Sequence, residues 1–302
     1  MRNKLIRCFS CAVVFLTCLY ASAQSPDLAR LEYTYFPQNN SDNSLRRLRA
    51  QLKYPIKLDD KGSYLVPGIE YRNVNFKYND QEIFNTGNLD RFQSFKATLG
   101  YTYKMNEFWR FGAEAGLNIA SNFSESDIFK DDLIYTAALY FIKTKENEEY
   151  YEPWRLILGM QYSTTTGLPL PLPIVNYYKR WNKNWSYMVG TPKSNLKYYI
   201  NEDHALEAFV MLDGFFSNIQ QNFEIDNGEA GNEQLAESMS MTIVISGLQY
   251  EYHITENLQF YIYGGHTLLN DIRLRDANRD NIYTINDTNS FYARGGLKFS
   301  IF

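Results

Sequence analysis

The sequence predicts an all-β fold, an antiparallel transmembrane β-barrel of about fourteen strands, from three observations. Apolar and polar residues alternate strictly in one segment after another, which is the period of a β-strand with two different faces. The segments run about ten residues, as a tilted strand needs to cross a bilayer. Tyr and Phe are abundant, at 25 and 20 residues, and they gather at segment ends as in the aromatic girdles of membrane barrels.

The clearest strands form a hairpin over residues 95–118. The first strand places Phe95, Ala97, Leu99, Tyr101, Tyr103 and Met105 on one face and Lys96, Thr98, Gly100, Thr102 and Lys104 on the other. The polar pair Asn106-Glu107 turns the chain, and the alternation resumes at Trp109. Glycines and charges of both signs on the polar face are typical of a barrel lumen, with lipid against the apolar face.

The remaining strands follow in order along the chain. We expect them at residues 31–35, 47–56, 64–73, 133–141, 156–162, 175–181, 185–189, 196–200, 206–216, 239–253, 259–268 and 291–302, which with the hairpin makes about fourteen. Pro67 weakens the third strand, because proline cannot donate a ladder hydrogen bond. Pro192 interrupts residues 185–200, so twelve strands is the alternative count.

The connections between strands alternate in length. Those after odd-numbered strands are long, with the longest at 217–237 and 271–289, whereas most others have about three to six residues. This asymmetry predicts short periplasmic turns, longer extracellular loops and both chain ends in the periplasm. The segment 167–173 alternates proline with other residues and is not expected to join a ladder. It forms either a stiff extracellular loop or a constriction folded into the lumen.

The first 23 residues differ in kind from the rest. A basic start is followed by an apolar stretch over residues 11–20 and by the small residues Ala21-Ser22-Ala23. We interpret residues 1–23 as a secretory signal peptide and residues 24–302 as the barrel. A lipid anchor at Cys18 is the alternative. All three cysteines precede residue 24, so the mature chain has neither disulfides nor cysteine metal sites.

Composition excludes several classes of function. Removing Arg2, Lys4 and Arg7 from the 30 basic residues leaves 27 against 34 acidic ones, a net charge of −7, which disfavours nucleic acid as a partner. A mean hydropathy of −0.41 argues against a bundle of transmembrane helices. The three histidines are isolated in the sequence and no nucleotide-binding loop occurs, so we expect no metal and no cofactor.

Charged residues of the polar phase are the candidate functional residues, because they face the lumen if the apolar phase faces lipid. They are Arg30, Glu32, Arg47, Arg49, Lys53, Glu70, Arg72, Lys96, Lys104, Arg110, Glu114, Arg155, Glu207, Asp213, Glu251, Arg294 and Lys298. Either they neutralise one another as ion pairs that fill a narrow barrel, or they line a water-filled pore. Basic residues outnumber acidic ones in this set, so such a pore favours anions.

Three functions follow as hypotheses. The first is a passive channel or small-solute uptake protein with a charged lumen. The second is a structural or surface-interaction barrel without transport. The third is a lipid-acting barrel enzyme, in which His266 lies near Thr267, Asp271 and Ser290 in the sequence.

The last strand and one central region carry a resemblance. The chain ends in Gly296-Leu297-Lys298-Phe299-Ser300-Ile301-Phe302, which resembles the terminal signal that barrel assembly machinery reads. Residues 171–179, Trp185 and Gly190-Thr191-Pro192 resemble an uncharacterised family of Bacteroidota outer-membrane barrels. The resemblance implies a barrel fold and an outer-membrane location, and it supplies no catalytic residues. We expect a monomer, with membrane lipid, the barrel assembly machinery and small solutes as partners.

Overall fold

The computed structural model describes residues 27–39, 41–80, 83–145, 153–162, 171–225 and 234–300. The strands in these ranges are β1 (Asp27–Pro37), β2 (Ser44–Lys53), β3 (Ile56–Lys57), β4 (Tyr64–Lys77), β5 (Arg91–Lys104), β6 (Trp109–Ser121), β7 (Leu133–Lys145), β8 (Trp154–Tyr162), β9 (Pro171–Arg180), β10 (Trp185–Gly190), β11 (Lys193–Tyr199), β12 (His204–Ile225), β13 (Gln234–His253), β14 (Leu258–Arg275), β15 (Asn281–Asn286) and β16 (Phe291–Ser300). A short 3₁₀ helix, η1, spans Lys130–Asp132. Within the described ranges, no helix has the length and apolar character to cross a membrane. The expected signal peptide at residues 1–23 and the last two residues of the chain lie outside them.

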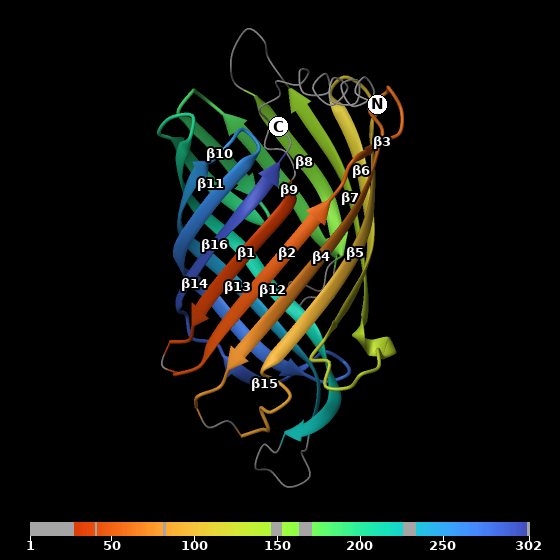
Figure 1. Cartoon of the computed structure of the whole chain (residues 1–302), viewed down its shortest axis with the longest axis vertical. Coiled ribbons are helices and arrows are strands. Elements are labelled where there is room, and N and C mark those ends of the chain that lie inside the picture. The colour runs from red at the N-terminus through yellow and green to blue at the C-terminus, as the bar shows by residue number, and fades with distance from the viewer. Residues whose placement is uncertain are drawn as a thin grey trace, which may run out of the picture.

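The strands close into a barrel (Figure 1). Leaving β3 and β15 aside, each strand pairs antiparallel with the next along the chain, and the circle closes where β1 pairs with β16. Two short strands lie outside the circle, since β3 pairs only with β4 and β15 only with β14. Fourteen of the sixteen strands therefore form the wall, which confirms the predicted antiparallel barrel.

The alternative count of twelve is wrong, because residues 185–200 form two strands. β10 and β11 pair with each other, and the turn between them contains Pro192. Gly190 has a φ of +144°, and a side chain on it would collide with the carbonyl oxygen of Val175 on β9. Glycine permits this turn, and proline occupies a position outside the ladder.

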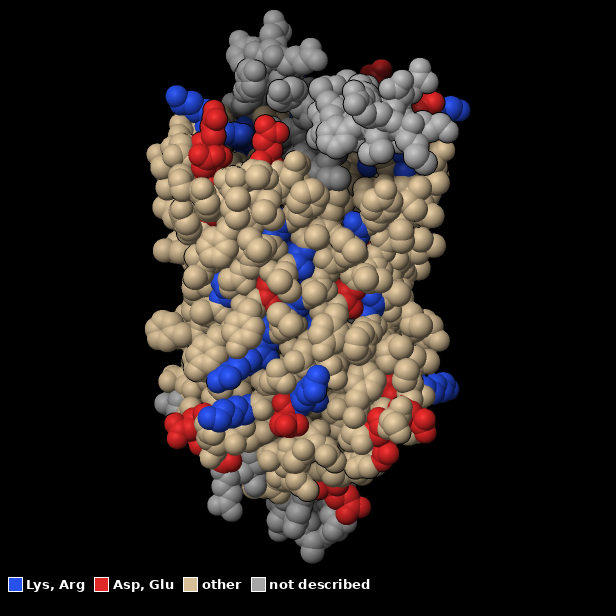
Figure 2. All heavy atoms as spheres, in the orientation of Figure 1, with Lys and Arg blue, Asp and Glu red and all other residues tan. Residues whose placement is uncertain are grey.

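The outer face of the wall is apolar over its middle. Large apolar side chains point outward from strand after strand, among them Ile69, Phe95, Leu139, Leu248 and Ile262, with Leu248 70% exposed. Figure 2 shows uncharged side chains over most of one side of the barrel, with the largest groups of charged side chains toward its two ends. An exposed apolar belt of this size is typical of the surface that a barrel presents to lipid.

The two ends of the barrel differ. The turns β5–β6, β9–β10, β11–β12 and β13–β14 are short, and they lie at the end where Asp27 of β1 pairs with Ser300 of β16 (Figure 1). The connections at the opposite end include the long segments between β4 and β5 and between β6 and β7. This arrangement agrees with the predicted asymmetry, with both ends of the described wall on the side of the short turns.

Two of the predicted loops are wrong. Residues 217–237 were expected to be the longest loop, yet β12 continues to Ile225 and β13 begins at Gln234. Residues 271–289 likewise contain the end of β14 and all of β15. β12 and β13 stay in strand conformation through these polar residues, and at 22 and 20 residues they exceed the ~10 that a tilted strand needs to cross a bilayer.

The expectation that the proline-rich segment cannot pair is wrong for its end. Residues 163–170 lie outside the described ranges, but Pro171 and Pro173 begin β9 and pair with Tyr162 and Met160 of β8. On the side of Pro173 that faces β10, its carbonyl oxygen accepts a hydrogen bond from Thr191 Oγ1. The β9–β10 ladder ends at Asn176 and does not reach Pro173. The missing N–H therefore falls on an edge without a ladder partner. Pro67 is similar, because its carbonyl oxygen meets Tyr54 just beyond the end of β2.

The extended β12–β13 hairpin folds across the mouth at the loop end. β12 leaves the wall and reaches β6 on the far side, where Asn218 pairs with Ser121 in parallel. Gln220 fixes the crossing, since its Nε2 donates to Asp132 Oδ2 at 2.7 Å and its backbone N–H donates to Asn122 Oδ1 at 2.8 Å. The hairpin thus covers part of the barrel mouth. Main-chain and side-chain hydrogen bonds to the β6–β7 connection hold it there.

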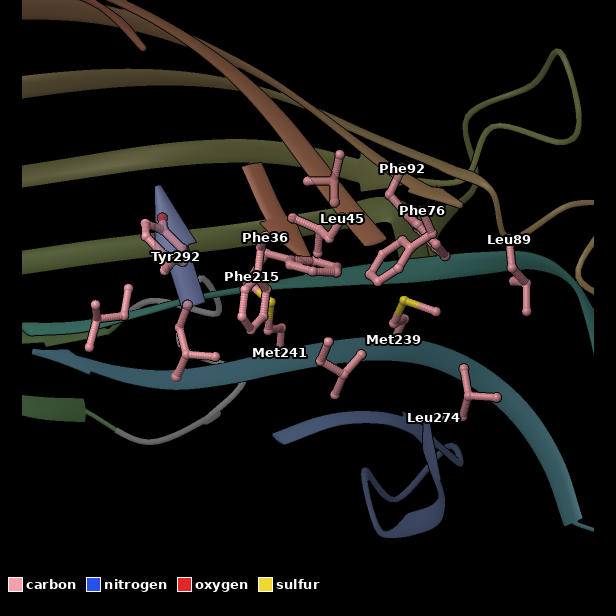
Figure 3. Close-up of a cluster of buried hydrophobic side chains, with 14 of the residues drawn as sticks. Phe36, Leu45, Phe76, Leu89, Phe92, Phe215, Met239, Met241, Leu274 and Tyr292 are labelled. Carbon is pink, nitrogen blue, oxygen red and sulfur yellow. The ribbon is translucent and has the colours of Figure 1, made fainter. Parts of the chain in front are cut away.

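Beneath this hairpin lies an apolar cluster inside the barrel (Figure 3). Phe36, Leu45, Phe76 and Phe92 project from β1, β2, β4 and β5 toward Phe215, Met239 and Met241 of the hairpin. Aromatic rings pack against one another through the cluster at tilted angles, with the ring centroid of Phe215 lying 6.0 Å from that of Phe76 and 6.2 Å from that of Phe92. This end of the barrel is therefore packed like the core of a soluble protein.

Candidate functional site

The strand register places one phase of side chains on the inner face of the barrel. Thr34 pairs with Arg47, Glu32 with Arg49 and Glu70 with Lys96, and their chain neighbours Tyr33, Leu48, Ile69 and Phe95 are exposed on the outer face. The charged residues singled out in the sequence are all in this inner phase. The structure divides them into a central network, a network nearer the short turns, a group around a cavity, and residues at the rim.

The central network is built around two carboxylates, Glu32 and Asp213. Glu32 lies 3.4 Å from both Arg49 and Arg294 and accepts a hydrogen bond from the hydroxyl of Tyr261 at 2.5 Å. Asp213 accepts two hydrogen bonds from Arg47, at 2.5 and 3.2 Å, and is also bound by Arg294. Because these residues come from β1, β2, β12, β14 and β16, the network ties together strands on both sides of the chain closure.

The second network lies nearer the short turns. Glu251 accepts a hydrogen bond from Lys197, with the two atoms 2.5 Å apart, and Lys298 lies 3.5 Å away. Glu207 forms ion pairs with Lys193 and Lys197. The two carboxylates are 1% and 2% exposed, so their charges depend on these partners rather than on bulk water.

A cavity of about 180 Å³ lies against the wall formed by β2, β4, β5, β6 and β8. It is lined by Arg49, Gln51, Lys53, Ile69, Glu70, Arg72, Lys96, Thr98, Glu114 and Gln161. Arg49 and Arg72 both bind Glu70, at 2.7 and 2.5 Å, and Lys53 binds Glu114 at 2.9 Å. The lining is mostly polar, and a volume of this size has room for about six waters at their liquid density.

Small inward residues explain why space remains on this side. Ala138 of β7 pairs with Glu114 on one side and Gln161 on the other, both of which line the cavity. Gly112, Gly116 and Gly159 occupy inward positions on β6 and β8. A side chain on Gly116 would come within 2.7 Å of Thr136 Oγ1, so these strands also pack closely. The central network adjoins this cavity, because Arg49 belongs to both.

The remaining predicted residues lie near the rims. Arg110 Nη1 donates to the carbonyl oxygen of Gly62 at 2.8 Å, and Lys104 pairs with Arg110 in the register and is exposed. Arg155 of β8 lies over the ring of Tyr178, 5.9 Å from its centroid. In the same turn region as Gly62, Asp59 accepts the backbone N–H groups of Ser63 and Lys61, both at 2.9 Å, and these hydrogen bonds lower the pKa of Asp59.

The histidines lie apart from one another. His204 Nδ1 is 2.6 Å from the hydroxyl of Tyr250, and His253 is 4.0 Å from Glu251. His266 is exposed on the outer face, with its ring against Phe291 and its Nδ1 2.8 Å from the carbonyl oxygen of Thr267. Among the residues that the structure describes, no group of three or more His, Cys, Asp or Glu is placed to hold a metal ion.

Sequence reasoning missed the apolar cluster, although the sequence carries a signal for it. In β13, Leu248 and Tyr252 lie on the outer face, whereas Met239, Met241, Ile243 and Ile245 are buried inside. The apolar phase therefore changes from even to odd positions within one strand. Where the phase inverts, the strand has left the lipid and encloses an apolar interior.

A family model matches the chain over residues 27–300. The chain belongs to the family described as domain of unknown function DUF6268. No curated protein matches it. The family model thus covers the whole of the described barrel, including the cavity and both charged networks.

Among solved structures, the DUF6268 chain is similar to several outer-membrane barrels. An outer membrane channel from Pseudomonas putida F1 has 11% identity and a TM-score of 0.43, with 94% of this chain and all of that chain covered. The TodX monoaromatic hydrocarbon channel has 11% identity and a TM-score of 0.39, covering 92% and 91%. The KdgM porin has 10% identity and a TM-score of 0.34, covering 90% and 99%.

Proposed function

We propose that this DUF6268 protein is an outer-membrane channel that passes small water-soluble solutes passively through a charged lumen. The observation that carries the proposal is the polar cavity of about 180 Å³ at membrane depth. Glu70 and Lys96 line it, while their chain neighbours Ile69 and Phe95 are 62% and 50% exposed toward lipid. Charged groups and water at this depth are expensive unless they serve a path or a site.

The path we propose runs along the wall from β5 to β10. Several inward positions of this wall are small or partly accessible, among them Ala138, Gly159 and Gln161. The networks around Asp213 and Glu251 fill the other side of the lumen, and the apolar cluster closes that side at the loop end. We infer a narrow conduit along the side that these groups leave unfilled, which agrees with small solutes rather than large ones.

The location is part of the same proposal. A closed antiparallel barrel with an apolar belt satisfies its backbone hydrogen bonds internally and can lie in a bilayer. Barrels of this kind are built in the outer membrane of Gram-negative cells, and the resemblance noted above is to those of Bacteroidota. Closure of the barrel by one chain supports a monomer.

Conductance in a planar lipid bilayer tests the proposal. Purified protein should give stepwise current increments, and Ala138→Trp should reduce them several-fold, because an indole between Glu114 and Gln161 fills the cavity. Ala137→Trp is the matched control, since Ala137 is the next residue on β7 and is exposed on the outer face. Folded protein that gives no current, or equal currents from the two variants, would contradict the channel.

The apolar cluster supports a second candidate, a barrel without transport that serves a structural or surface-interaction role. Its side chains are almost fully buried, with Phe36 and Met239 at 0% exposure, and the β12–β13 hairpin lies across the mouth. A protein of this kind inserts into bilayers and stays silent. The β12–β13 hairpin or the β14–β15 region would then bind an external partner, which would explain why these strands extend at the loop end.

A further inference from the structure

The cavity between β2 and β8 has an excess of positive charge. Of the charged residues around it, Arg49, Lys53, Arg72 and Lys96 are basic and Glu70 and Glu114 are acidic. The balance is +2 among the charged side chains that line the cavity. A charge excess in such a place is stabilised by anions, because there is less water to screen it.

Two of these cations, Arg72 and Lys96, have side-chain N–H groups that are not used in hydrogen bonds within the described residues. Arg72 binds Glu70 through Nε, and no bond to its terminal nitrogens occurs among the described residues. Within the same ranges, the ammonium group of Lys96 makes no hydrogen bond and no ion pair, although it lines the cavity. The other two cations are engaged, since Arg49 binds Glu70 and Lys53 binds Glu114.

The register brings the two donors to one place. Glu70 pairs with Lys96 across β4 and β5, and Arg72 pairs with Ser94, so Arg72 and Lys96 are diagonal neighbours on the inner face. Diagonal neighbours have Cβ atoms about 7–8 Å apart, within reach of two long side chains that bind one molecule. Neutral partners complete the lining, from Gln51, Thr98 and Gln161.

We propose that this cavity is a binding site for a small dicarboxylate, with Arg72 and Lys96 as its anchors. The net charge of +2 matches two carboxylates. An apolar cavity of ~150 Å³ holds benzene, so one of about 180 Å³ holds a molecule of roughly eight non-hydrogen atoms such as succinate. The inference rests on the proposed function, since the site lies on the proposed path and names the class of solute that uses it.

Binding to the folded protein in detergent micelles tests the site without a membrane. Isothermal titration at constant ionic strength compares succinate with inorganic sulfate and with neutral succinamide. We expect succinate to bind, sulfate to bind more weakly and succinamide to give no heat. Sulfate bound in preference to succinate, or succinamide bound as well as succinate, would overturn the assignment to a dicarboxylate.

The variants Lys96→Gln and Arg72→Gln should each weaken succinate binding about tenfold or more, which corresponds to the loss of one charge-assisted hydrogen bond. Lys104→Gln is the matched control, because Lys104 is on the same strand as Lys96 and outside the cavity. If Arg72→Gln fails to fold, Lys96→Met, which keeps the length of the side chain, carries the test. Equal binding by Lys96→Gln and Lys104→Gln would overturn the site.

The binding measurement and the conductance measurement can fail independently of each other. Succinate binding that depends on Lys96, in a protein that gives no bilayer current, would keep the site and refute the transport. Current without succinate binding would refute the site and keep the channel.

Discussion

Asp213 is the carboxylate on which the central network most depends, and replacing it by asparagine tests that network. Its oxygens accept hydrogen bonds from Arg47 and Arg294, whose side chains are only 3% and 5% exposed. Asp213→Asn removes the negative charge and keeps the shape. Two buried guanidinium groups then remain, and Arg294 keeps Glu32, at 3.4 Å, as its acidic partner.

The expected cost follows from the burial of these groups. Breaking a buried ion pair by removing one partner destabilises a protein by about 3–5 kcal/mol, because the other charge stays buried and unpaired. Asparagine still offers one acceptor, and Asp213 itself is 16% exposed, so the lower end of that range applies. We expect the free energy of unfolding to fall by about 3 kcal/mol, which is roughly a hundredfold in the unfolding equilibrium.

Reversible urea unfolding in lipid vesicles, followed by tryptophan fluorescence, measures this change. Asp60→Asn is the matched control, because Asp60 makes the same kind of contact with Lys57, at 2.7 Å, but in full exposure to solvent. Exposed pairs contribute little to stability, so the control should unfold like the wild type. Similar midpoints for Asp213→Asn and the wild type would refute the claim that the network holds the two sides of the closure together.

Two further predictions concern the loop end. Gln220→Ala should speed hydrogen exchange in residues 218–225, because it removes the Nε2 hydrogen bonds to Asp132 and to the carbonyl oxygen of Asp127, at 2.7 and 3.0 Å. Unchanged exchange would mean that these bonds do not hold the hairpin across the mouth. Phe215→Ala should lower the free energy of unfolding by about 3–5 kcal/mol, because the side chain is 5% exposed and packs between Phe76 and Phe92; a loss under about 1 kcal/mol would show a loosely packed cluster.

The period of two along the chain was sufficient to predict the barrel. Alternation depends only on neighbours, so it showed which residues share a face and where most of the strands lie. It failed at Pro171 and Pro173, because a proline is tolerated where the strand has an edge without a ladder partner, and that depends on where β10 ends. It failed at residues 217–237 because a polar run predicts a loop, whereas β12 continues to Ile225 and β13 begins at Gln234, with Gln220 held by hydrogen bonds to Asp132 and Asn122.

The pairing of the charges was beyond sequence reasoning for a different reason. Arg47 and Asp213 are 166 residues apart, and they meet only because β12 lies opposite β2 across a closed barrel. Alternation predicts that both face inward, but it does not say which cation meets which carboxylate. The position of the cavity likewise depends on the strand register, which places small residues such as Ala138 next to Glu114.

Water access to single positions tests most directly whether the lumen is wet on one side and packed on the other. All three cysteines of the sequence precede residue 24, so Ala138→Cys, Ala137→Cys and Ile243→Cys give single thiols in the barrel. In lipid vesicles, a small charged thiol reagent that does not cross membranes should modify Cys only at the lumen-facing position 138. Protection of position 138, or equal modification of the buried position 243, would contradict a polar path beside the apolar cluster.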